Sequence, residues 1–399
     1  MKVSRSKYLS LSAGGAVAGA AFLMANSSIG PGFLTQTTVF TGQLLTSFGF
    51  VILVSVLLDI GAQLNTWRIV TVTGLRAQDL ANGLFPGLGY LLCVLVVLGG
   101  FAFNIGNIAG CGLGANVLTG LSFKAGAALS GGLALALFWI REMGRMLDGL
   151  TKILGVLKIG LTLFVACAVH PPLGEALYHT VFPARVSATA IVTIVGGTVG
   201  GYITFSGAHR LLDAGITGRE NQGRVNRSAI AGILISTFMR FVLFLAVVGA
   251  VLHGAIPDKD NPAASVFAYG AGLVGLRIFG IVLWSAALSS VVGASYTAVS
   301  FFKTFHPFLA RYERVWISLF ILLSTVVFVW VGKPKELLLL AGWVNGLILP
   351  FALGVLLLAA TRQRLMKGYR HPVWMQAAGW LVVLVMGGMS LGSLWGFWR

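Results

Sequence analysis

Charged side chains are scarce in this chain. Only 10% of its 399 residues are charged, while 57% are hydrophobic, whereas about a quarter of the residues in soluble domains are charged. A soluble chain of this length could not cover its surface with so few charges. We therefore expect the bilayer to be the solvent for most of the surface.

Acidic residues and cysteines are scarcer still. The chain has 11 acidic and 28 basic residues, a net charge of +17. The basic residues lie in short clusters between long apolar runs, which is typical of membrane loops and argues against nucleic-acid binding. Three cysteines at 93, 111 and 167 show neither disulfide nor zinc spacing. Without a His/Glu cluster or a nucleophile with a base, the sequence does not predict an enzyme.

Long apolar runs predict an all-α membrane protein with about 11 transmembrane helices. The N-terminal run resembles a signal peptide but has no convincing cleavage site, so a retained first helix is expected. No linker separates soluble domains, and residues 1–399 are predicted to form a single transmembrane transporter domain. The predicted segments are 11–46 (broken), 48–70, 88–119, 124–140, 149–170, 187–216 (broken), 228–253, 266–301, 314–331, 335–360 and 372–396.

The basic residues predict an orientation. If the N-terminus is cytoplasmic, most Lys and Arg side chains fall in cytoplasmic loops, as the positive-inside rule requires. The sequence therefore predicts a multi-pass protein of the cell (plasma or inner) membrane, with its N-terminus cytoplasmic and its C-terminus outside.

Glycine and proline interrupt two of the predicted segments. The first contains Gly30-Pro31-Gly32 and the sixth contains Gly196-Gly197 and Gly200-Gly201. Such residues unwind a helix, which is tolerated at membrane depth only inside protein or beside a cavity. Two broken helices five segments apart predict inverted repeats, at about 11–170 and 187–360, plus an extra helix at 372–396. The alternative is that the glycines only allow close helix packing.

Several motifs carry a family resemblance that runs from about residue 12 to the end. They are Phe22-Leu23-Met24 before Gly30-Pro31-Gly32-Phe33, the stretch 104–110, the stretch 197–202, Leu288-Ser289-Ser290 and Leu349-Pro350-Phe351-Ala352. In order and spacing they resemble the natural resistance-associated macrophage protein (NRAMP) family of divalent-metal transporters. The resemblance implies a LeuT-like fold of the APC superfamily, with helices 1 and 6 broken, and secondary transport by alternating access.

The metal ligands implied by the resemblance are absent here. The family's ligand Asp and Asn fall on Gly30 and Phe33, its methionine on Gly200, and a tenth-helix glutamine on or near Gly342. Its third-helix acids become Asn104 and Asn107, and its sixth-helix histidine becomes Tyr202. Divalent cations need oxygen, nitrogen or sulfur ligands that glycine and phenylalanine side chains lack. No side-chain metal site is predicted.

The helix breaks are the predicted substrate site. Helix N-termini there would present free amides and a positive dipole end, which suit an anion or a carboxylate. Each polar side chain has a structural alternative, since Ser and Thr bond their own helix and Asn joins helices. The candidate substrate-binding residues are Ser27, Ser28, Gly30, Gly32, Phe33, Asn104, Asn107, Thr198, Gly200, Gly201 and Tyr202.

Buried charges and a serine pair complete the candidate residues. Asp59 is expected to form a structural ion pair with Lys158 or Arg240. His209, Arg210 and Asp213 are candidates for an inner gate. Ser289 and Ser290 resemble hydroxyl ligands of the sodium site in broken-helix transporters, so Na⁺ is the candidate coupling ion, with no other cofactor.

Three functions remain open from the sequence. The first is transport of a small organic solute with a carboxylate, such as an amino-acid-like or cyclic lactam acid. The second is transport of a divalent metal ion, Mg²⁺ or Mn²⁺, at an atypical site. The third is a receptor or scaffold without transport. The expected partners are a small-molecule or ion substrate and the lipid bilayer; the oligomeric state is not predicted.

Overall fold

The computed structural model describes residues 28–397, and the side chains of all of these except 141–152 and 396–397. Regular structure in this range is helical. The helices are α2 (Pro31–Leu44), η1 (Leu45–Ser47), α3 (Phe48–Thr73), α4 (Ala77–Leu84), α5 (Leu88–Thr119), α6 (Phe123–Trp139), α7 (Arg141–Ala168), α8 (Leu173–Val181), α9 (Ala188–Val199), α10 (Ile203–Asp213), α11 (Gln222–Leu252), α12 (Pro262–Phe302), α13 (Pro307–Arg311), α14 (Glu313–Val331), α15 (Pro334–Thr361) and α16 (Val373–Phe397).

Every predicted transmembrane segment contains a helix in the described range. The predicted segment 88–119 is α5, and 187–216 is divided into α9 and α10. The part of the first segment at 11–27 lies outside the described residues. The sequence analysis missed the short helices α4, α8 and α13, which lie in the connections between the long helices.

The spans agree with the predicted count. Within residues 28–397, eight helical stretches are long and apolar enough to cross a membrane, with α2 and α3 joined in one stretch and α9 and α10 in another. α6 is a shorter apolar helix, and α7 is bent by 109° from α8, so α8 turns away from it. The eight stretches, with α2 taken apart from α3 and with α6 and α7 added, account for the eleven predicted segments.

Local sequence explains where the long helices begin and end. α2, α12 and α15 start with proline at the first helical position, where its missing amide is not needed. The side chains of Ser122, Ser187 and Asn261 accept backbone N–H bonds at the starts of α6, α9 and α12, as N-cap residues do. Gly74 and Gly120 end α3 and α5 with φ of 66° and 77°, a conformation that favours glycine.

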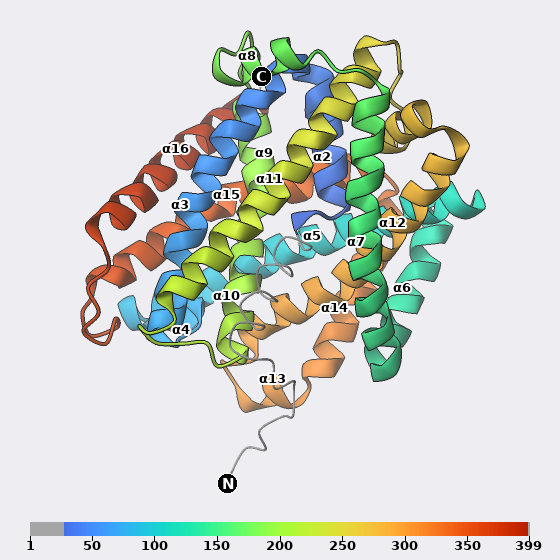
Figure 1. Cartoon of the computed structure of the whole chain (residues 1–399). Helices are drawn as coiled ribbons and strands as arrows, with labels where there is room; N and C mark the ends of the chain where they lie inside the picture. The colour runs from blue at the N-terminus through green and yellow to red at the C-terminus, as the bar shows by residue number, and fades with distance from the viewer. Residues whose placement is uncertain (1–27, 398–399) are drawn as a thin grey trace.

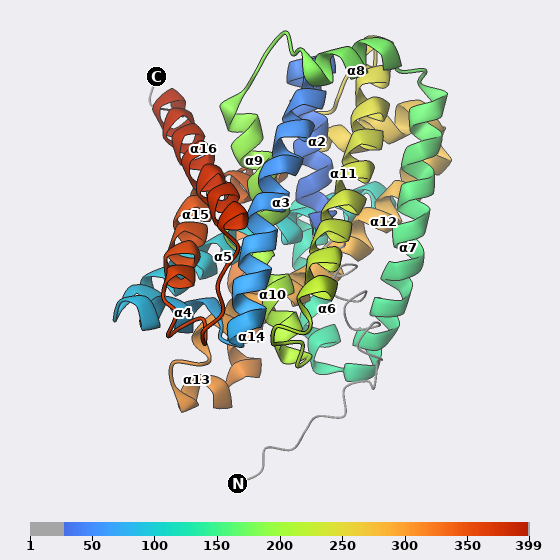
Figure 2. The same cartoon turned by 60° about the vertical axis from the view of Figure 1, so that its left-hand side comes forward.

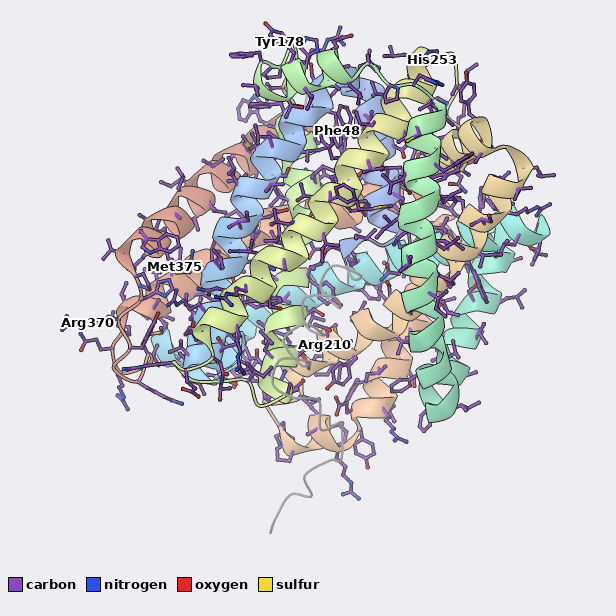
Figure 3. The ribbon with its side chains drawn as sticks, viewed as in Figure 1. Phe48, Tyr178, Arg210, His253, Arg370 and Met375 are labelled. Atoms are coloured by element: carbon purple, nitrogen blue, oxygen red, sulfur yellow. The ribbon has the colours of Figure 1, made fainter. Side chains whose placement is uncertain are left out.

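The long helices form a bundle whose two ends differ. α4 and α13 lie at one end and α8 lies at the other (Figure 1). α5 crosses the bundle at a steep angle to α7 and packs against α12 and α15, while α16 packs against α15 at the edge (Figure 2). Arg210 and Arg370 lie toward the α13 end, whereas Tyr178 and His253 lie at the α8 end (Figure 3).

Candidate functional site

The sixth predicted segment is broken at residues 200–202. α9 ends at Val199, Gly200 has φ −51° and ψ 175°, and α10 begins at Ile203. The amide of Gly201 donates to the carbonyl of Asn345 on α15, at 3.0 Å. Gly196 and Gly197 remain helical, so the unwound stretch is shorter than the sequence predicted. This stretch, together with Thr198 and Val199 at the end of α9, is called break six below.

The first predicted segment also has a break before α2. Gly30 precedes the first turn of α2 with φ −91° and ψ −170°, and no side chain caps that turn. We call residues 28–33 break one; they comprise helical Ser28, the bend at Ile29 and Gly30, and the first turn of α2 as far as Phe33. The hydroxyl of Ser28 donates to the carbonyl of Thr198 at 3.2 Å, which joins break one to the end of α9. Ser27 lies outside the described residues.

One face of α5 passes both breaks. A methyl group added at Gly110 would overlap Pro31 at the start of α2, and one at Gly100 would lie 3.0 Å from the Tyr202 ring. Phe103 packs its ring 5.9 Å from that of Tyr202. Asn107, only 3% exposed, shares this helix face by its spacing from positions 100, 103 and 110. It therefore lies between the two breaks.

Arg240 on α11 joins the two breaks with a buried guanidinium. Its Nη1 donates to Thr198 Oγ1 at 2.9 Å, and the group lies over the Phe33 ring, 4.3 Å from the centroid. Arg240 is 3% exposed, and its Nε and Nη2 have no hydrogen-bond partner among the described residues. The site therefore contains a positive charge with two free donors.

Lys158 on α7 brings a second positive charge to break one. Its Nζ donates to the carbonyl of Ile29 at 2.8 Å, and the residue is 5% exposed. Carbonyls freed by an unwound helix can coordinate Na⁺ in broken-helix transporters. In this protein an ammonium group takes such a carbonyl.

The ion pair predicted for Asp59 is not made by direct contact. No ion pair within 4.0 Å joins Asp59 to Lys158 or Arg240 among the described side chains. Asp59 is 1% exposed, and its Oδ1 has no hydrogen-bond partner within residues 28–397. Its interaction with Arg240 is electrostatic, at longer range than an ion pair. The cations instead donate to acceptors at the breaks, Lys158 to the Ile29 carbonyl and Arg240 to the Thr198 hydroxyl.

Comparison with known proteins identifies the family. The family model Nramp, natural resistance-associated macrophage protein-like, matches residues 21–396. The chain belongs to this family.

Close and distant relatives agree with this assignment. The chain is 54% identical over 376 residues to an uncharacterized membrane protein, YcsG, of Bacillus subtilis, covering 94% of this chain and 93% of that one. It is 53% identical over 375 residues to an uncharacterized membrane protein of Haemophilus influenzae, covering 94% of each. It is 24% identical over 414 residues to the divalent metal cation transporter MntH of Klebsiella pneumoniae (strain 342), covering 96% of this chain and 95% of that one.

Solved structures show the same fold. A manganese transporter mutant from Eremococcus coleocola aligns with a TM-score of 0.74 at 18% identity, over 95% of this chain and 86% of that one. MhsT in complex with L-phenylalanine aligns with a TM-score of 0.59 at 16% identity, over 93% of this chain and 98% of that one. The Nramp-family chain is therefore a multi-span membrane transporter of a small molecule or ion, with the predicted LeuT-like fold.

The glycines of break six allow close packing, whereas their predicted contact with a substrate stays a prediction. A methyl group added at Gly200 would lie 2.7 Å from Asn345 Cβ and would overlap the carbonyl of Gly196, and one at Gly201 would overlap Ile348. These glycines allow α15 to pack against the break, which was the alternative left open by the sequence. Gly32 is less crowded, with Gln36 Nε2 at 3.3 Å.

Two amide side chains at this site were missed by sequence reasoning. Gln36 on α2 donates from Nε2 to the Leu338 carbonyl at 2.9 Å and lies against Gly197 and Gly342. It thus places an amide at the position where the Nramp resemblance implied a lost glutamine. Asn345 donates from Nδ2 to the Gly99 carbonyl at 2.9 Å. Both are fully buried, and in the part of the chain that the structure describes Gln36 Oε1 and Asn345 Oδ1 have no hydrogen-bond partner. The sequence signal for both residues is a polar amide side chain inside an otherwise apolar helical segment.

Other predicted residues bond within or between helices. Asn104 donates to Ser295 and Ser324 hydroxyls, both at 3.1 Å, and so ties α5 to α12 and α14. Ser289 donates to the Ala286 carbonyl of its own helix at 3.0 Å. The sodium site at Ser289 and Ser290 stays a prediction. Within the described part of the chain, no group of three or more His, Cys, Asp or Glu side chains could hold a metal ion.

Polar contacts join helices at the α13 end of the bundle. Asp213, at the end of α10, accepts from Arg76 Nη2 at 2.6 Å and from the Tyr296 hydroxyl at 3.5 Å. Beside it, Lys303 pairs with Glu313 at 2.7 Å. Of the predicted gate residues, Asp213 joins α10 to the α3–α4 connection, and His209 lies 3.4 Å from the Ser300 hydroxyl.

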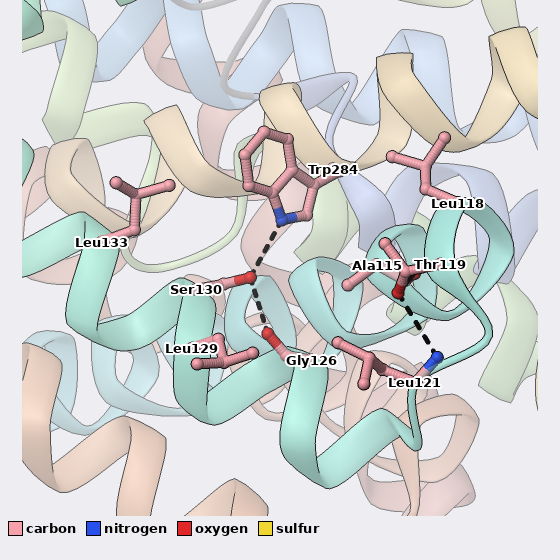
Figure 4. A pocket seen from close by; sticks show the side chains of 9 residues that line it. All are labelled: Ala115, Leu118, Thr119, Leu121, Gly126, Leu129, Ser130, Leu133 and Trp284. Atoms are coloured by element: carbon pink, nitrogen blue, oxygen red, sulfur yellow. Dashed lines mark hydrogen bonds between the residues drawn. The ribbon is translucent and has the colours of Figure 1, made fainter.

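A surface pocket of about 260 Å³ lies between α5, α6 and α12 (Figure 4). Its lining is apolar apart from a few hydroxyls, and Trp284 Nε1 donates to the Ser130 hydroxyl at 2.9 Å. It includes no residue of either break, so it is not part of the candidate site.

Proposed function

We propose that this protein is a secondary transporter that carries a small organic carboxylate by alternating access, bound between the two helix breaks. This proposal rests on Arg240, whose buried guanidinium touches both breaks and keeps two donors free among the described residues. A guanidinium presents paired N–H groups that match a carboxylate. A carboxylate at this place would satisfy donors that the protein leaves unpaired.

The backbone adds to this positive environment. The first turns of α2 and α10 have no side-chain cap. Free N–H groups and the positive end of the helix dipole there favour an anion. The neutral acceptors Gln36 Oε1 and Asn345 Oδ1 could bind other polar groups of the solute.

Arg240 and Lys158 oppose cations at the same place. Two unit charges about 5 Å apart repel by about 3 kcal/mol at an effective dielectric constant of about 20, and a divalent ion doubles this. A divalent cation would also depend on backbone carbonyls and water for ligands. Transport of Mg²⁺ or Mn²⁺ at an atypical site remains the alternative. It is favoured by the similarity of this chain to a divalent metal cation transporter and to a manganese transporter.

The topology and coupling are part of the proposal. Basic residues in the connections at the α4 and α13 end favour a cytoplasmic position for that end in the cell membrane. The Lys158 ammonium at the Ile29 carbonyl argues against Na⁺ at break one, whereas the hydroxyls of Ser289 and Ser290 favour a sodium site. Carboxylate uptake measured with and without a sodium gradient tests whether transport is coupled to Na⁺.

A binding screen tests the proposal. Purified protein in nanodiscs is heated with MnCl₂, MgCl₂ or one of a panel of small organic acids. We expect monocarboxylates to raise the melting temperature and the metal salts to have no saturable effect. Arg240→Gln should abolish the shift, whereas Lys335→Gln, which removes an equal charge from a partly exposed pair 3.8 Å from Glu336, should keep it. Saturable Mn²⁺ binding with no carboxylate response would support the alternative.

A further inference from the structure

The candidate site lies among the three buried charged side chains of the described structure. Asp59, Lys158 and Arg240 are the Asp, Glu, Lys and Arg residues with less than a tenth of their surface exposed. Arg240 touches both breaks and Lys158 touches break one. Asp59, on α3, interacts electrostatically with Arg240. The other described charged groups lie nearer the surface.

These three groups carry a net charge of +1 in their ordinary ionised forms. Buried charge is unfavourable unless an opposite charge compensates it. A monovalent anion would bring the net charge of the site to zero. A zwitterion would leave it at +1, a dianion would make it −1, and a divalent cation would raise it to +3.

The neutral groups at the breaks give a second, independent constraint. An ammonium group on the solute would be repelled by Arg240 and Lys158, and the free acceptors beside break six are the uncharged Gln36 Oε1 and Asn345 Oδ1. The carboxylate of Asp59 already interacts electrostatically with Arg240. Gln36 lies beside Gly197 and Asn345 beside Gly200. Such oxygens suit an N–H or O–H group that carries no charge.

From these observations we infer that the substrate class is a monocarboxylate without a charged amine, bearing at most neutral hydrogen-bond donors. Zwitterionic amino acids and dicarboxylates are discriminated against by charge rather than by size. This inference rests on the proposed function, because it assigns the charge of the carboxylate solute.

Ligand sets with one skeleton and different charges test the inference. Tetrahydrofuran-2-carboxylate, proline and tetrahydrofuran-2,5-dicarboxylate share a five-membered ring and carry −1, 0 and −2. Linear and benzyl sets extend the series to other shapes. Binding to the wild-type protein in nanodiscs is measured by calorimetry at pH 7. We expect the monoanion of at least one set to bind at least tenfold more tightly than its zwitterion and its dianion.

The outcomes separate the inference from the proposed function. Equal or tighter binding of the zwitterion or dianion in every set that binds would overturn the inference and leave carboxylate transport standing. Binding of no carboxylate in any set, together with saturable Mn²⁺ binding, would overturn both.

Charge variants then test the mechanism of selection. Asp59→Asn raises the net charge to +2 and should shift the preference toward the dicarboxylate by about tenfold. Lys158→Met lowers it to zero and should shift the preference toward the zwitterion. Lys335→Gln changes the total charge by the same amount outside the site and should leave the preference unchanged. If a variant does not fold, the wild-type series alone decides; an unchanged preference in both folded variants would contradict the inference.

Discussion

Replacing Arg240 by glutamine should separate ligand binding from stability. The substitution removes the Nε and Nη2 donors that lack partners and the Nη1 bond to Thr198. A hydrogen bond to a charged group contributes about 1.5 to 3 kcal/mol. Two such bonds to a carboxylate amount to about 3 to 6 kcal/mol, so affinity should fall by about 10² to 10⁴.

The same change should destabilise the empty protein through Asp59. That carboxylate is 1% exposed and interacts electrostatically with Arg240. Losing one member of a buried charge pair leaves the other uncompensated, at a cost of several kcal/mol for groups in contact and less at longer range. Adding Asp59→Asn to Arg240→Gln should restore part of the lost melting temperature but none of the carboxylate affinity.

A double-mutant cycle in nanodiscs measures both effects. Melting temperatures report stability, and calorimetry with a monocarboxylate reports affinity, for wild type, each single variant and the double variant. Arg240→Lys keeps the charge without the planar pair of donors and should bind with intermediate affinity. Arg240→Gln protein that binds the carboxylate within threefold of wild type would refute the placement of the solute at the breaks.

Three further predictions follow from the packing. Gly200→Ala should lower the melting temperature, because the added methyl group would overlap the backbone of the preceding turn. Gly32→Ala should be tolerated, because the atom nearest its methyl group would be Gln36 Nε2 at 3.3 Å. Equal melting temperatures of the two variants would contradict this. Asp213→Asn should break the 2.6 Å pair with Arg76 and increase labelling of a cysteine introduced on α10, measured with a membrane-impermeant reagent from the α13 end. Burial and the nearby charge of Arg68 lower the pKa of His371 to about 4. The unfolded chain therefore binds a proton at this side chain near pH 6.5, whereas the folded protein does not until about pH 4. The melting temperature should fall as pH drops from about 6.5 toward 4, and should fall less in His371→Gln.

The bundle could be predicted from sequence because its signals are long. Apolar runs of span length, glycines and a proline locate the long helices and the two breaks. α4, α8 and α13 were missed because they are short, with 8, 9 and 5 residues, and carry no span-length pattern. The repeat boundaries, the membrane orientation and the sodium site remain predictions.

The sequence predicts which segments form the site but not which side chains meet there. The sequence identifies buried ionisable groups but not which face of a helix meets which break. It therefore pairs Asp59 with Lys158 or Arg240 and does not predict the contacts of these two cations with Ile29 and Thr198. For the same reason Asn104 and Asn107, one helical turn apart, were treated alike. The structure places Asn107 on the face of α5 that passes the breaks and ties Asn104 to α12 and α14.

Transport by reconstituted protein tests directly whether the protein carries a carboxylate bound at the helix breaks. Proteoliposomes containing wild-type, Arg240→Gln or Lys335→Gln protein are given a radiolabelled monocarboxylate chosen from the binding screen, or radioactive Mn²⁺. We expect saturable carboxylate uptake by wild type and Lys335→Gln, loss of that uptake in Arg240→Gln, and no saturable Mn²⁺ uptake by any of them. Saturable Mn²⁺ uptake by wild type, with carboxylate uptake no greater than in empty liposomes, would contradict it.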